Sequence, residues 1–165
     1  MEELILKAKD GDKTAFTELM LQIKDELYKI AKVRLKNDND IFDVIQETMI
    51  LAYKSIKKLK YDYYFKTWII KILINECNKF YRVKSKRKED SYEILSNEIV
   101  NPNDAEERIN LEFICNKLTK EEGTIILLYY MEKYTDKEIG KIMNKKESTI
   151  RTKRNRAKDK IRKFL

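Results

Sequence analysis

Arginine is the scarcer basic residue of this chain, and it is unevenly placed. Only eight of the 36 lysines and arginines are arginine, and four of the eight fall between residues 151 and 162. Lysine acts toward phosphate as a point charge, whereas the planar fork of arginine suits bidentate hydrogen bonding to the edge of a guanine base. The cluster therefore indicates contact with the bases of a nucleic acid as well as with its phosphates.

The net charge of +8 is divided along the chain. Residues 48–88 carry 12 basic and 2 acidic side chains, and residues 145–165 carry 10 and 2. Residues 1–47 and 89–144 are acidic instead, with 8 basic against 11 acidic side chains and 6 against 13. Two separated basic segments favour a polyanion that is contacted at two places.

Several classes of chemistry are missing from the sequence. The chain has no histidine, which excludes Ser-His and Cys-His nucleophile pairs and every histidine-ligated metal site. Cys77 and Cys115 lie far apart and are expected to be half-buried thiols in a reducing cytosol. Asp38 and Asp40 would suit a small metal-dependent nuclease, but nothing completes a ligand set around them. No apolar run approaches the ~18 residues of a membrane span. We predict no enzymatic activity, no metal, no cofactor and no membrane insertion.

The composition predicts an all-α fold, because three glycines and one proline are too few for a turn-rich β-structure. Apolar spacing indicates a short amphipathic turn around residues 4–8 and a helix capped by Asp12. Two later helices begin with the spacing of a capping box, at Thr119 with Glu122 and at Thr135 with Glu138, and Asn144 with Glu147 forms a looser version. The expected helices cover residues 12–31, 40–59, 65–82, 104–118, 119–131, 135–143 and 145–164.

The helical periodicity fails in one polar stretch, residues 84–103, which holds the only proline, Pro102. These roughly 20 residues could span up to ~70 Å when fully extended. We therefore predict two small helical domains, residues 1–83 and 104–165, joined by a flexible linker. The second would be a four-helix domain that contains a helix-turn-helix.

Residues 134–157 carry the helix-turn-helix pattern. A short helix would bury Ile139 and Ile142, and after a polar turn a longer basic helix would start near Glu147. Such a second helix enters the major groove while the first braces against the backbone. An ordinary helical hairpin with a basic solvent face would share this pattern. Ile150, Ala157 and Ile161 are predicted to face inward, and the groove-facing residues to be Thr149, Arg151, Thr152, Asn155 and Arg156.

Two further features precede the linker. Asp43, Gln46 and Glu47 share one face of a predicted helix, at the i, i+3, i+4 spacing that a solvated face would also show. Five aromatic residues lie within residues 61–68, and aromatic crowding often marks a core. The three tyrosines among them sit in a hydrophilic bend beside lysines, where unpaired bases could stack.

The order and spacing of these motifs resemble the extracytoplasmic-function (ECF) sigma factors of bacterial RNA polymerase over nearly the whole chain. The matching blocks are Ala8-Lys9-Asp10-Gly11-Asp12, Asp43-Val-Ile-Gln46-Glu47, Phe65-Lys-Thr-Trp68, Tyr134-Thr-Asp-Lys-Glu138-Ile139-Gly140 and Ser148-Thr149-Ile150-Arg151-Thr152-Lys153.

The resemblance implies a cytoplasmic bacterial sigma factor that binds the polymerase core and promoter DNA, with an anti-sigma factor as a further partner. It implies that Asp43, Gln46 and Glu47, called here the docking set, bind the clamp helices of the largest subunit. A −10 set would recognise and open the −10 element: Lys60, Tyr61, Tyr63, Tyr64, Lys66, Lys71, Asn75 and Arg82. A −35 set would read the −35 element as duplex: Lys137, Thr149, Arg151, Thr152, Lys153, Asn155 and Arg156.

Three residues depart from the family pattern. Arg154 stands where a leucine-like residue is usual, Lys79 replaces an acidic residue, and Lys146 takes the place of a small capping residue or proline. The alternative function is a polymerase-independent helix-turn-helix regulator, which would leave the acidic helix and the aromatic bend without roles.

Overall fold

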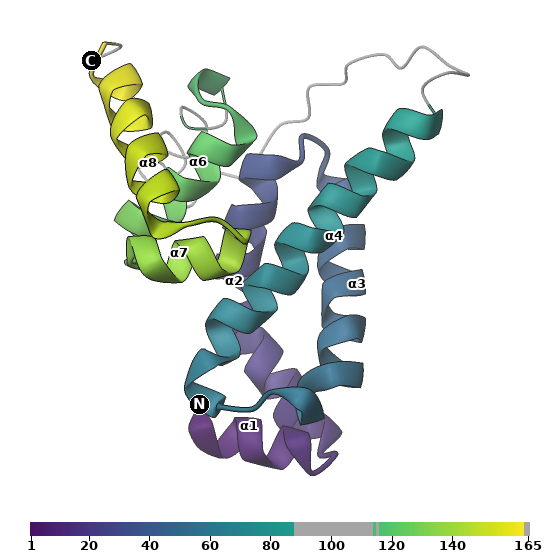
Figure 1. Ribbon diagram of the computed structural model, residues 1–165. Coiled ribbons are helices and arrows are strands. Elements are labelled where there is room, and N and C mark those ends of the chain that lie inside the picture. Colours follow the sequence, from purple (N-terminus) through teal and green to yellow (C-terminus); the bar gives the residue numbers. More distant parts are fainter. Residues whose placement is uncertain (88–113, 115, 164–165) are drawn as a thin grey trace.

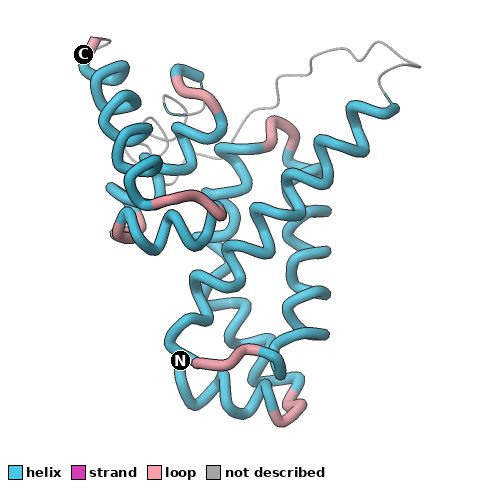
Figure 2. Tube along the Cα trace, in the orientation of Figure 1, coloured by secondary structure: helices cyan, strands magenta, loops and turns pink. Residues whose placement is uncertain are grey.

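The computed structural model describes residues 1–87, 114 and 116–163, and within these ranges the protein is helical and contains no strand (Figures 1 and 2). The predicted all-α class is therefore confirmed. No helix in these ranges is long and apolar enough to span a membrane. The helices are α1 (Glu2–Lys9), α2 (Lys13–Arg34), α3 (Asp38–Ser55), α4 (Phe65–Arg87), α6 (Lys120–Ile126), α7 (Asp136–Met143) and α8 (Glu147–Arg162).

Several predicted helix ends were wrong. α3 starts at Asp38 and not at Asp40, because the Asn37 side chain caps it by accepting a hydrogen bond from the backbone N–H of Asn39 at 2.8 Å. It also ends at Ser55, and the chain then forms the short 3₁₀ turn η1 (Ile56–Lys58). α4 continues to Arg87, so the first residues of the predicted linker are helical. The predicted linker beyond residue 87 and most of the predicted helix 104–118 lie outside the described residues.

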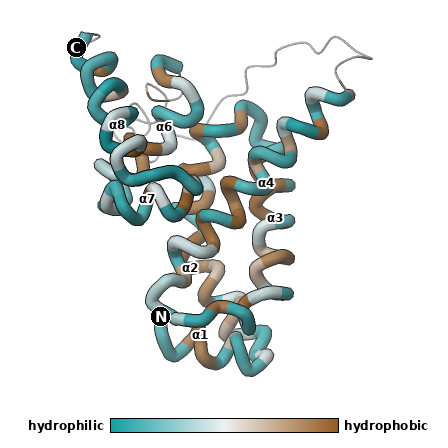
Figure 3. Tube along the Cα trace, in the orientation of Figure 1, coloured by the Kyte–Doolittle hydropathy of each residue, from teal (hydrophilic) through white to brown (hydrophobic). Residues whose placement is uncertain are grey.

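Helices α1 to α4 form an N-terminal unit around α2. Leu19, Ile23, Leu27 and Ile30 follow one stripe of α2 at spacings of three and four residues, and all four are fully buried. α3 and α4 pack against each other and against α2, and α1 covers the lower end of α2 (Figure 1). Figure 3 shows apolar segments turned toward these contacts. Burial of each such side chain stabilises the fold by about 1.5–3 kcal/mol.

Helices α6 to α8 form a C-terminal unit whose starts follow the predicted caps. The capping boxes of α6 and α7 are both present, with the Thr119 and Thr135 hydroxyls accepting backbone N–H groups at 3.2 Å. α6 continues into the π-helical segment η3 (Leu127–Met131). The looser cap predicted at Asn144 was wrong: this residue adopts the left-handed conformation, with φ 55°, and ends α7. α8 begins at Glu147, as the helix-turn-helix pattern predicted and two residues after the start expected from the apolar spacing.

The turn between α7 and α8 depends on a glycine inside α7. The carbonyl of Gly140 accepts a hydrogen bond from the Lys145 backbone N–H at 2.9 Å, which brings the turn back onto the helix. A Cβ at residue 140 would lie 2.7 Å from the Lys145 carbonyl oxygen, closer than a carbon can approach. The close approach of backbone to backbone therefore requires glycine here.

The two units pack directly against each other, which the sequence did not predict. α6 lies on α2 and α7 lies on α4, so that the buried apolar residues form one continuous cluster (Figure 1). Gly123 of α6 permits this approach, because a Cβ there would lie 2.8 Å from Cγ1 of Val33. The guanidinium of Arg34 fills the adjacent space. It donates hydrogen bonds to the Thr124 hydroxyl at 3.0 Å and the Asn78 side-chain oxygen at 2.7 Å.

Replacement of Gly140 by alanine should destabilise the C-terminal unit. The added methyl group meets the Lys145 backbone carbonyl in the tight turn between α7 and α8, so we expect a loss of about 1–3 kcal/mol in the free energy of unfolding. Urea unfolding followed by circular dichroism measures this loss. Lys137→Ala, an exposed change on the same helix, is the control. An unchanged unfolding midpoint for Gly140→Ala would contradict the proposed close approach.

Candidate nucleic-acid interface

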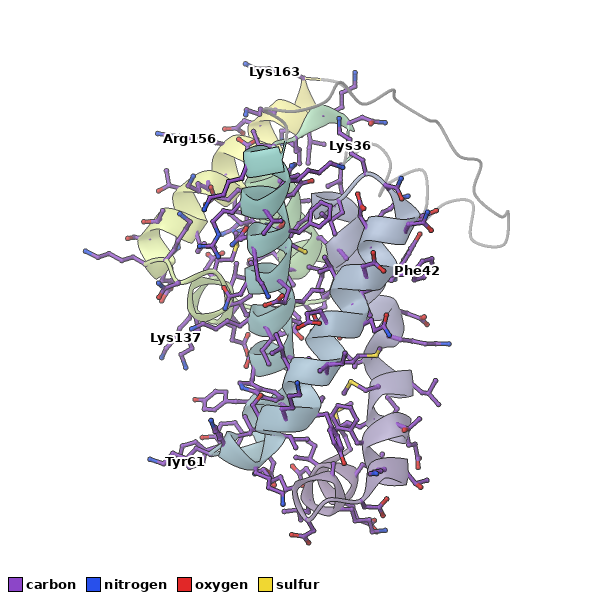
Figure 4. All side chains as sticks on the ribbon, turned by 90° about the vertical axis from the view of Figure 1, so that its right-hand side faces the viewer. Lys36, Phe42, Tyr61, Lys137, Arg156 and Lys163 are labelled. Atoms are coloured by element: carbon purple, nitrogen blue, oxygen red, sulfur yellow. The ribbon has the colours of Figure 1, made fainter. Side chains whose placement is uncertain are left out.

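The central residues of the −35 set share one exposed face of α8. Arg151, Thr152, Asn155 and Arg156 occupy positions i, i+1, i+4 and i+5, and all four are exposed. On the opposite face Ile150 and Ala157 are fully buried and Ile161 is half-buried, as predicted from their spacing. Figure 4 shows Arg156 and Lys137 projecting from the same side of the molecule. Thr149 is half-buried at the edge of this face.

Lys153 differs from the rest of the −35 set because it points toward α6. Its ammonium lies 3.1 Å from the Glu121 carboxylate, which also pairs with Lys145 at 3.2 Å. Partial burial raises the pKa of Glu121, but the two lysines more than offset this effect and hold it below its ordinary value. These ion pairs connect α8 and its turn to α6. Lys153 therefore lies between the two helices, away from the side chains that were predicted to face the groove.

Asp136 is the centre of a cluster at the start of α7. Its side chain is largely buried and accepts two hydrogen bonds from Arg154, at 2.9 Å from Nε and 3.0 Å from Nη2. The guanidinium carbon of Arg154 also lies 4.1 Å from the centroid of the Tyr129 ring. Arg154 thus replaces apolar packing with a bidentate ion pair and a cation–π contact. The hydrogen bonds from Arg154 hold the pKa of Asp136 below its ordinary value.

The aromatic part of the −10 set forms one cluster on the short turn η2 (Asp62–Tyr64). Ring centroids of Tyr61 and Tyr63 lie 5.5 Å apart, and those of Tyr63 and Tyr64 lie 4.3 Å apart. Tyr63 keeps 68% of its surface exposed, and Lys60 stands 5.4 Å from the Tyr61 ring. These rings are a surface feature and not part of the core. They offer stacking faces beside a positive charge.

The remaining −10 residues lie along α4. Lys71, Asn75 and Arg82 are exposed and recur at spacings of four and seven residues, which places them on one face of the helix. Lys66 is also exposed, but its ammonium lies 3.3 Å from the Glu26 carboxylate of α2. The −10 set therefore comprises a row of polar side chains that leads up α4 from the tyrosine cluster.

The docking set lies on a different face of the molecule. Asp43, Gln46 and Glu47 are all exposed on α3. Phe42, one residue before this set, keeps 60% of its surface exposed and projects away from the side that carries Tyr61, Lys137 and Arg156 (Figure 4). The exposed aromatic ring is the interface-like feature of this face, because aromatic residues are enriched at protein interfaces. Sequence reasoning did not single out Phe42, although an apolar residue beside a polar triplet was visible.

Side chains of the N-terminal and C-terminal units meet beside the tyrosine cluster. The Lys141 ammonium lies 3.4 Å from the Tyr64 hydroxyl and 4.8 Å from the centroid of its ring, and this hydrogen bond lowers the pKa of Tyr64. Nearby, the Tyr134 hydroxyl donates a 2.6 Å hydrogen bond to Glu26, while burial and this carboxylate raise the pKa of Tyr134. Tyr64 of the −10 set thus lies against α7, the first helix of the predicted helix-turn-helix.

The interface residues between the units were missed at the sequence level. Arg34 gave no signal beyond its rarity, since it ends an otherwise ordinary amphipathic helix. Gly123 was one of only three glycines, and its place inside a predicted helix could have indicated a close approach of another element. Asp136, which lies inside the C-terminal unit, was also missed, because an acidic residue in a first helical turn stabilises many helices without further contacts.

The carboxylates of the nuclease alternative do not converge. Asp38 accepts hydrogen bonds from Tyr28 at 3.2 Å and Lys32 at 3.1 Å, and Asp40 lies 3.6 Å from Lys84. Each is directed to a separate lysine. Residues 1–87, 114 and 116–163 contain no cluster of three metal-ligating side chains. Cys77 is fully buried, and burial raises the pKa of its thiol to about 11.

Comparisons with known proteins agree with this geometry. Residues 19–87 match the family model "Sigma-70 region 2", and residues 116–163 match "Sigma-70, region 4". The chain is 27% identical to the ECF RNA polymerase sigma factor SigW of Bacillus subtilis, over all of this chain and 96% of that protein. It is also 27% identical to the ECF RNA polymerase sigma-E factor of Haemophilus influenzae, over 97% and 92% of the two chains.

Two solved structures share the fold. One is CnrH in complex with the cytosolic domain of CnrY, with a TM-score of 0.73 and 19% identity over 99% of this chain and 96% of that one. The other is the sigma factor RpoE in complex with the anti-sigma factor NepR from Bartonella quintana. Its TM-score is 0.76, with 18% identity over 90% of this chain and 94% of that one.

Replacement of Asp136 by asparagine should remove about 2 kcal/mol of stability at neutral pH, because Arg154 loses a buried counter-charge. The pKa of Asp136 is depressed in the folded protein. The extra stability of the wild-type protein is therefore fully present above the pKa of an aspartate in the unfolded chain, about 4. It is lost as the pH falls through the lower pKa that Asp136 has in the folded protein. Urea unfolding at pH 7 and pH 3 measures both effects.

Asp159→Asn serves as the control for this prediction, since Asp159 is an exposed acidic residue of α8. Its free energy of unfolding should stay close to that of the wild-type protein at both pH values. If Asp136→Asn and the wild-type protein differed by the same amount at pH 3 and pH 7, the ion pair would not be the source of the effect.

Proposed function

We propose residue-level roles for this chain, which belongs to the extracytoplasmic-function sigma factors. As a sigma factor it directs promoter-specific transcription initiation by RNA polymerase. The single observation that supports the division of roles is the placement of three exposed side-chain sets on separate helices. These are an acidic set on α3, an aromatic and polar set at the start and along one face of α4, and a basic set on α8.

The docking set on α3 binds the clamp helices of the largest polymerase subunit. Asp43, Gln46 and Glu47 offer an exposed acidic and polar surface, and Phe42 adds an apolar ring that would lose its contact with water in a complex. Aromatic side chains that become buried on binding are common interface hot spots. This face lies away from the DNA-reading side chains labelled in Figure 4, so one protein could contact polymerase and promoter together.

The −10 set recognises and opens the −10 element. Tyr61, Tyr63 and Tyr64 present exposed rings on which unpaired bases would stack, with about 1–3 kcal/mol for each base. Lys71, Asn75 and Arg82 would follow the strand along the exposed face of α4. The −35 set reads duplex DNA through the exposed face of α8, where Arg151 and Arg156 supply the forks that suit guanine.

In this structure the two units are packed against each other, an arrangement that we call closed. The units must separate before both elements are read. The −10 and −35 elements are about 25 base pairs apart by position, which is roughly 85 Å of B-form DNA. In this structure the Tyr64 hydroxyl and the Lys141 ammonium are only 3.4 Å apart. We infer that α6 and α7 leave α2 and α4 when the protein binds polymerase and promoter.

Further assignments follow from the family. Its members are non-enzymatic regulators, and we propose that this chain likewise has no catalytic activity of its own and acts in the bacterial cytoplasm. The structural relative RpoE was solved with an anti-sigma factor, which supports a similar protein as a partner of this chain. A polymerase-independent regulator is disfavoured, because both sigma-70 regions match in their usual order.

Reversal of the charge at Glu47 should weaken polymerase binding. Glu47→Lys places a positive charge in an acidic docking face, so we expect an increase of at least about tenfold in the dissociation constant for core enzyme. Fluorescence anisotropy with purified bacterial core polymerase measures it, and transcription from promoter fragments should fall in parallel. Glu18→Lys, at an exposed position on α2, is the matched charge reversal. Equal binding by Glu47→Lys and Glu18→Lys would reject the docking set.

Replacement of Gly123 by alanine should open the protein without touching any of the three sets. The added methyl group would lie 2.8 Å from Val33, whereas alanine favours the α6 helix itself by about 0.5–1 kcal/mol. We expect a larger radius of gyration in small-angle X-ray scattering, with helical circular dichroism unchanged. Thr14→Ala, exposed on α2, should stay as compact as the wild-type protein. A compact Gly123→Ala would show that the contact of α2 with α6 does not hold the units together.

A further inference from the structure

Arg151 differs from the other exposed basic residues of the −35 set in having two acidic neighbours. Its Nη2 donates a hydrogen bond to the Glu147 carboxylate at 2.7 Å, and its Nε lies 3.5 Å from Oδ2 of Asp136. Glu147 stands one turn earlier on the same helix, whereas Asp136 comes from α7. An exposed arginine that is held from two helices has lost much of the rotamer freedom usual for such a side chain.

The second of these neighbours is itself fixed. Asp136 is largely buried, and Arg154, one turn further along α8, holds it with two hydrogen bonds. Arg154 in turn lies over the Tyr129 ring of the preceding π-helical segment. Because Asp136 is itself held in place, its Oδ2 is a fixed partner for Arg151 and not a mobile surface charge.

The two acidic neighbours occupy one edge of the guanidinium. Nε and Nη2 lie on the same side of that planar group, and they face Asp136 and Glu147. The outer edge, formed by Nη1 and the second hydrogen of Nη2, is left for another acceptor. A guanine offers O6 and N7 as two adjacent acceptors in the major groove, and the outer edge of an arginine matches them.

We propose that Glu147 and Asp136 are positioning residues that aim Arg151 at one guanine of the −35 element. This inference rests on the proposed function of α8 and goes beyond it by naming what determines specificity at one base pair. The same carboxylates repel phosphate, so they weaken attraction to DNA of any sequence while leaving the bidentate contact in place. Glu147 thus contributes selectivity at a cost in non-specific affinity.

The test uses the full chain assembled with bacterial core polymerase. The probe is a pool of duplexes with a fixed −10 region and randomised base pairs in the −35 region, and bound and unbound fractions are sequenced. Wild-type protein should select a guanine at one position, and Arg151→Ala should lower that preference by about 5- to 150-fold. Glu147→Ala should lower the preference at this same position by about two- to tenfold.

The conservative variant separates positioning from charge. Glu147→Gln keeps an oxygen that accepts from Arg151, so it should retain most of the preference, whereas both Glu147 variants should bind unselected duplexes more tightly. Asp159→Ala is the control, because Asp159 is an exposed carboxylate of α8 that lies 3.9 Å from Arg162. It removes the same charge from the same helix and should leave the preference at the Arg151 position unchanged.

The outcomes distinguish this inference from the function on which it rests. If the wild-type protein selects no sequence in the randomised region, both the −35 role of α8 and the positioning of Arg151 are rejected. If Arg151→Ala relaxes one position but Glu147→Ala does not, α8 reads the element and the positioning role is wrong. An equal loss of preference in Glu147→Ala and Asp159→Ala would reduce the effect to net charge and also overturn the inference.

Discussion

The buried guanidinium of Arg34 is the constraint on which the closed structure depends. It sits where α2, α4 and α6 meet, 9% exposed, and its hydrogen bonds go to the neutral side chains of Asn78 and Thr124. Its Nε has no hydrogen-bond partner in the described part of the chain. Desolvation of a charge costs several kcal/mol, and neutral partners recover only part of that cost. The contact between the two units is therefore specific in geometry but modest in net stability.

Arg154 is a second arginine with little exposed surface, but unlike Arg34 it has a charged partner. Asp136 neutralises it with two hydrogen bonds, and Tyr129 covers its face. That cluster lies inside the C-terminal unit and ties α8 to α7, so the helix-turn-helix keeps its shape whether or not the units are in contact. Rigidity within the unit and a weaker contact between the units fit the proposal that the two units separate on promoter binding while the helix-turn-helix keeps its geometry.

Acidic and basic segments that are separate along the chain also lie on separate surfaces of the folded protein. The acidic docking set lies on α3, and the basic and aromatic sets lie on α4 and α8. Glu26 of α2 pairs with Lys66 of α4 and accepts a hydrogen bond from Tyr134 of the C-terminal unit, and these contacts are local and partly exposed. Such contacts lose strength with salt and exchange readily for other partners, of which a phosphate backbone is the strongest competitor.

The sequence alone determined the elements and their faces. Helix periodicity, two capping boxes and the position of Ile150 and Ala157 follow from local spacing and from hydrogen bonds within one turn, so they could be read without tertiary information. The same holds for the α8 face, since side chains one turn apart share a side of a helix. The start of α3 and the end of α7 could not be read exactly, because Asn37 and Asn144 each fit more than one role at a helix terminus.

The tertiary structure decided which other elements these helix faces contact. The contact of α6 with α2 joins residues about 90 positions apart, and the roles of Gly123, Arg34 and Asp136 arise only from such pairings. A lone arginine at a helix end and an aspartate in a first helical turn have ordinary local explanations. Their burial and their partners depend on how separate helices pack, and the spacing of residues within a single helix carries no information about that packing.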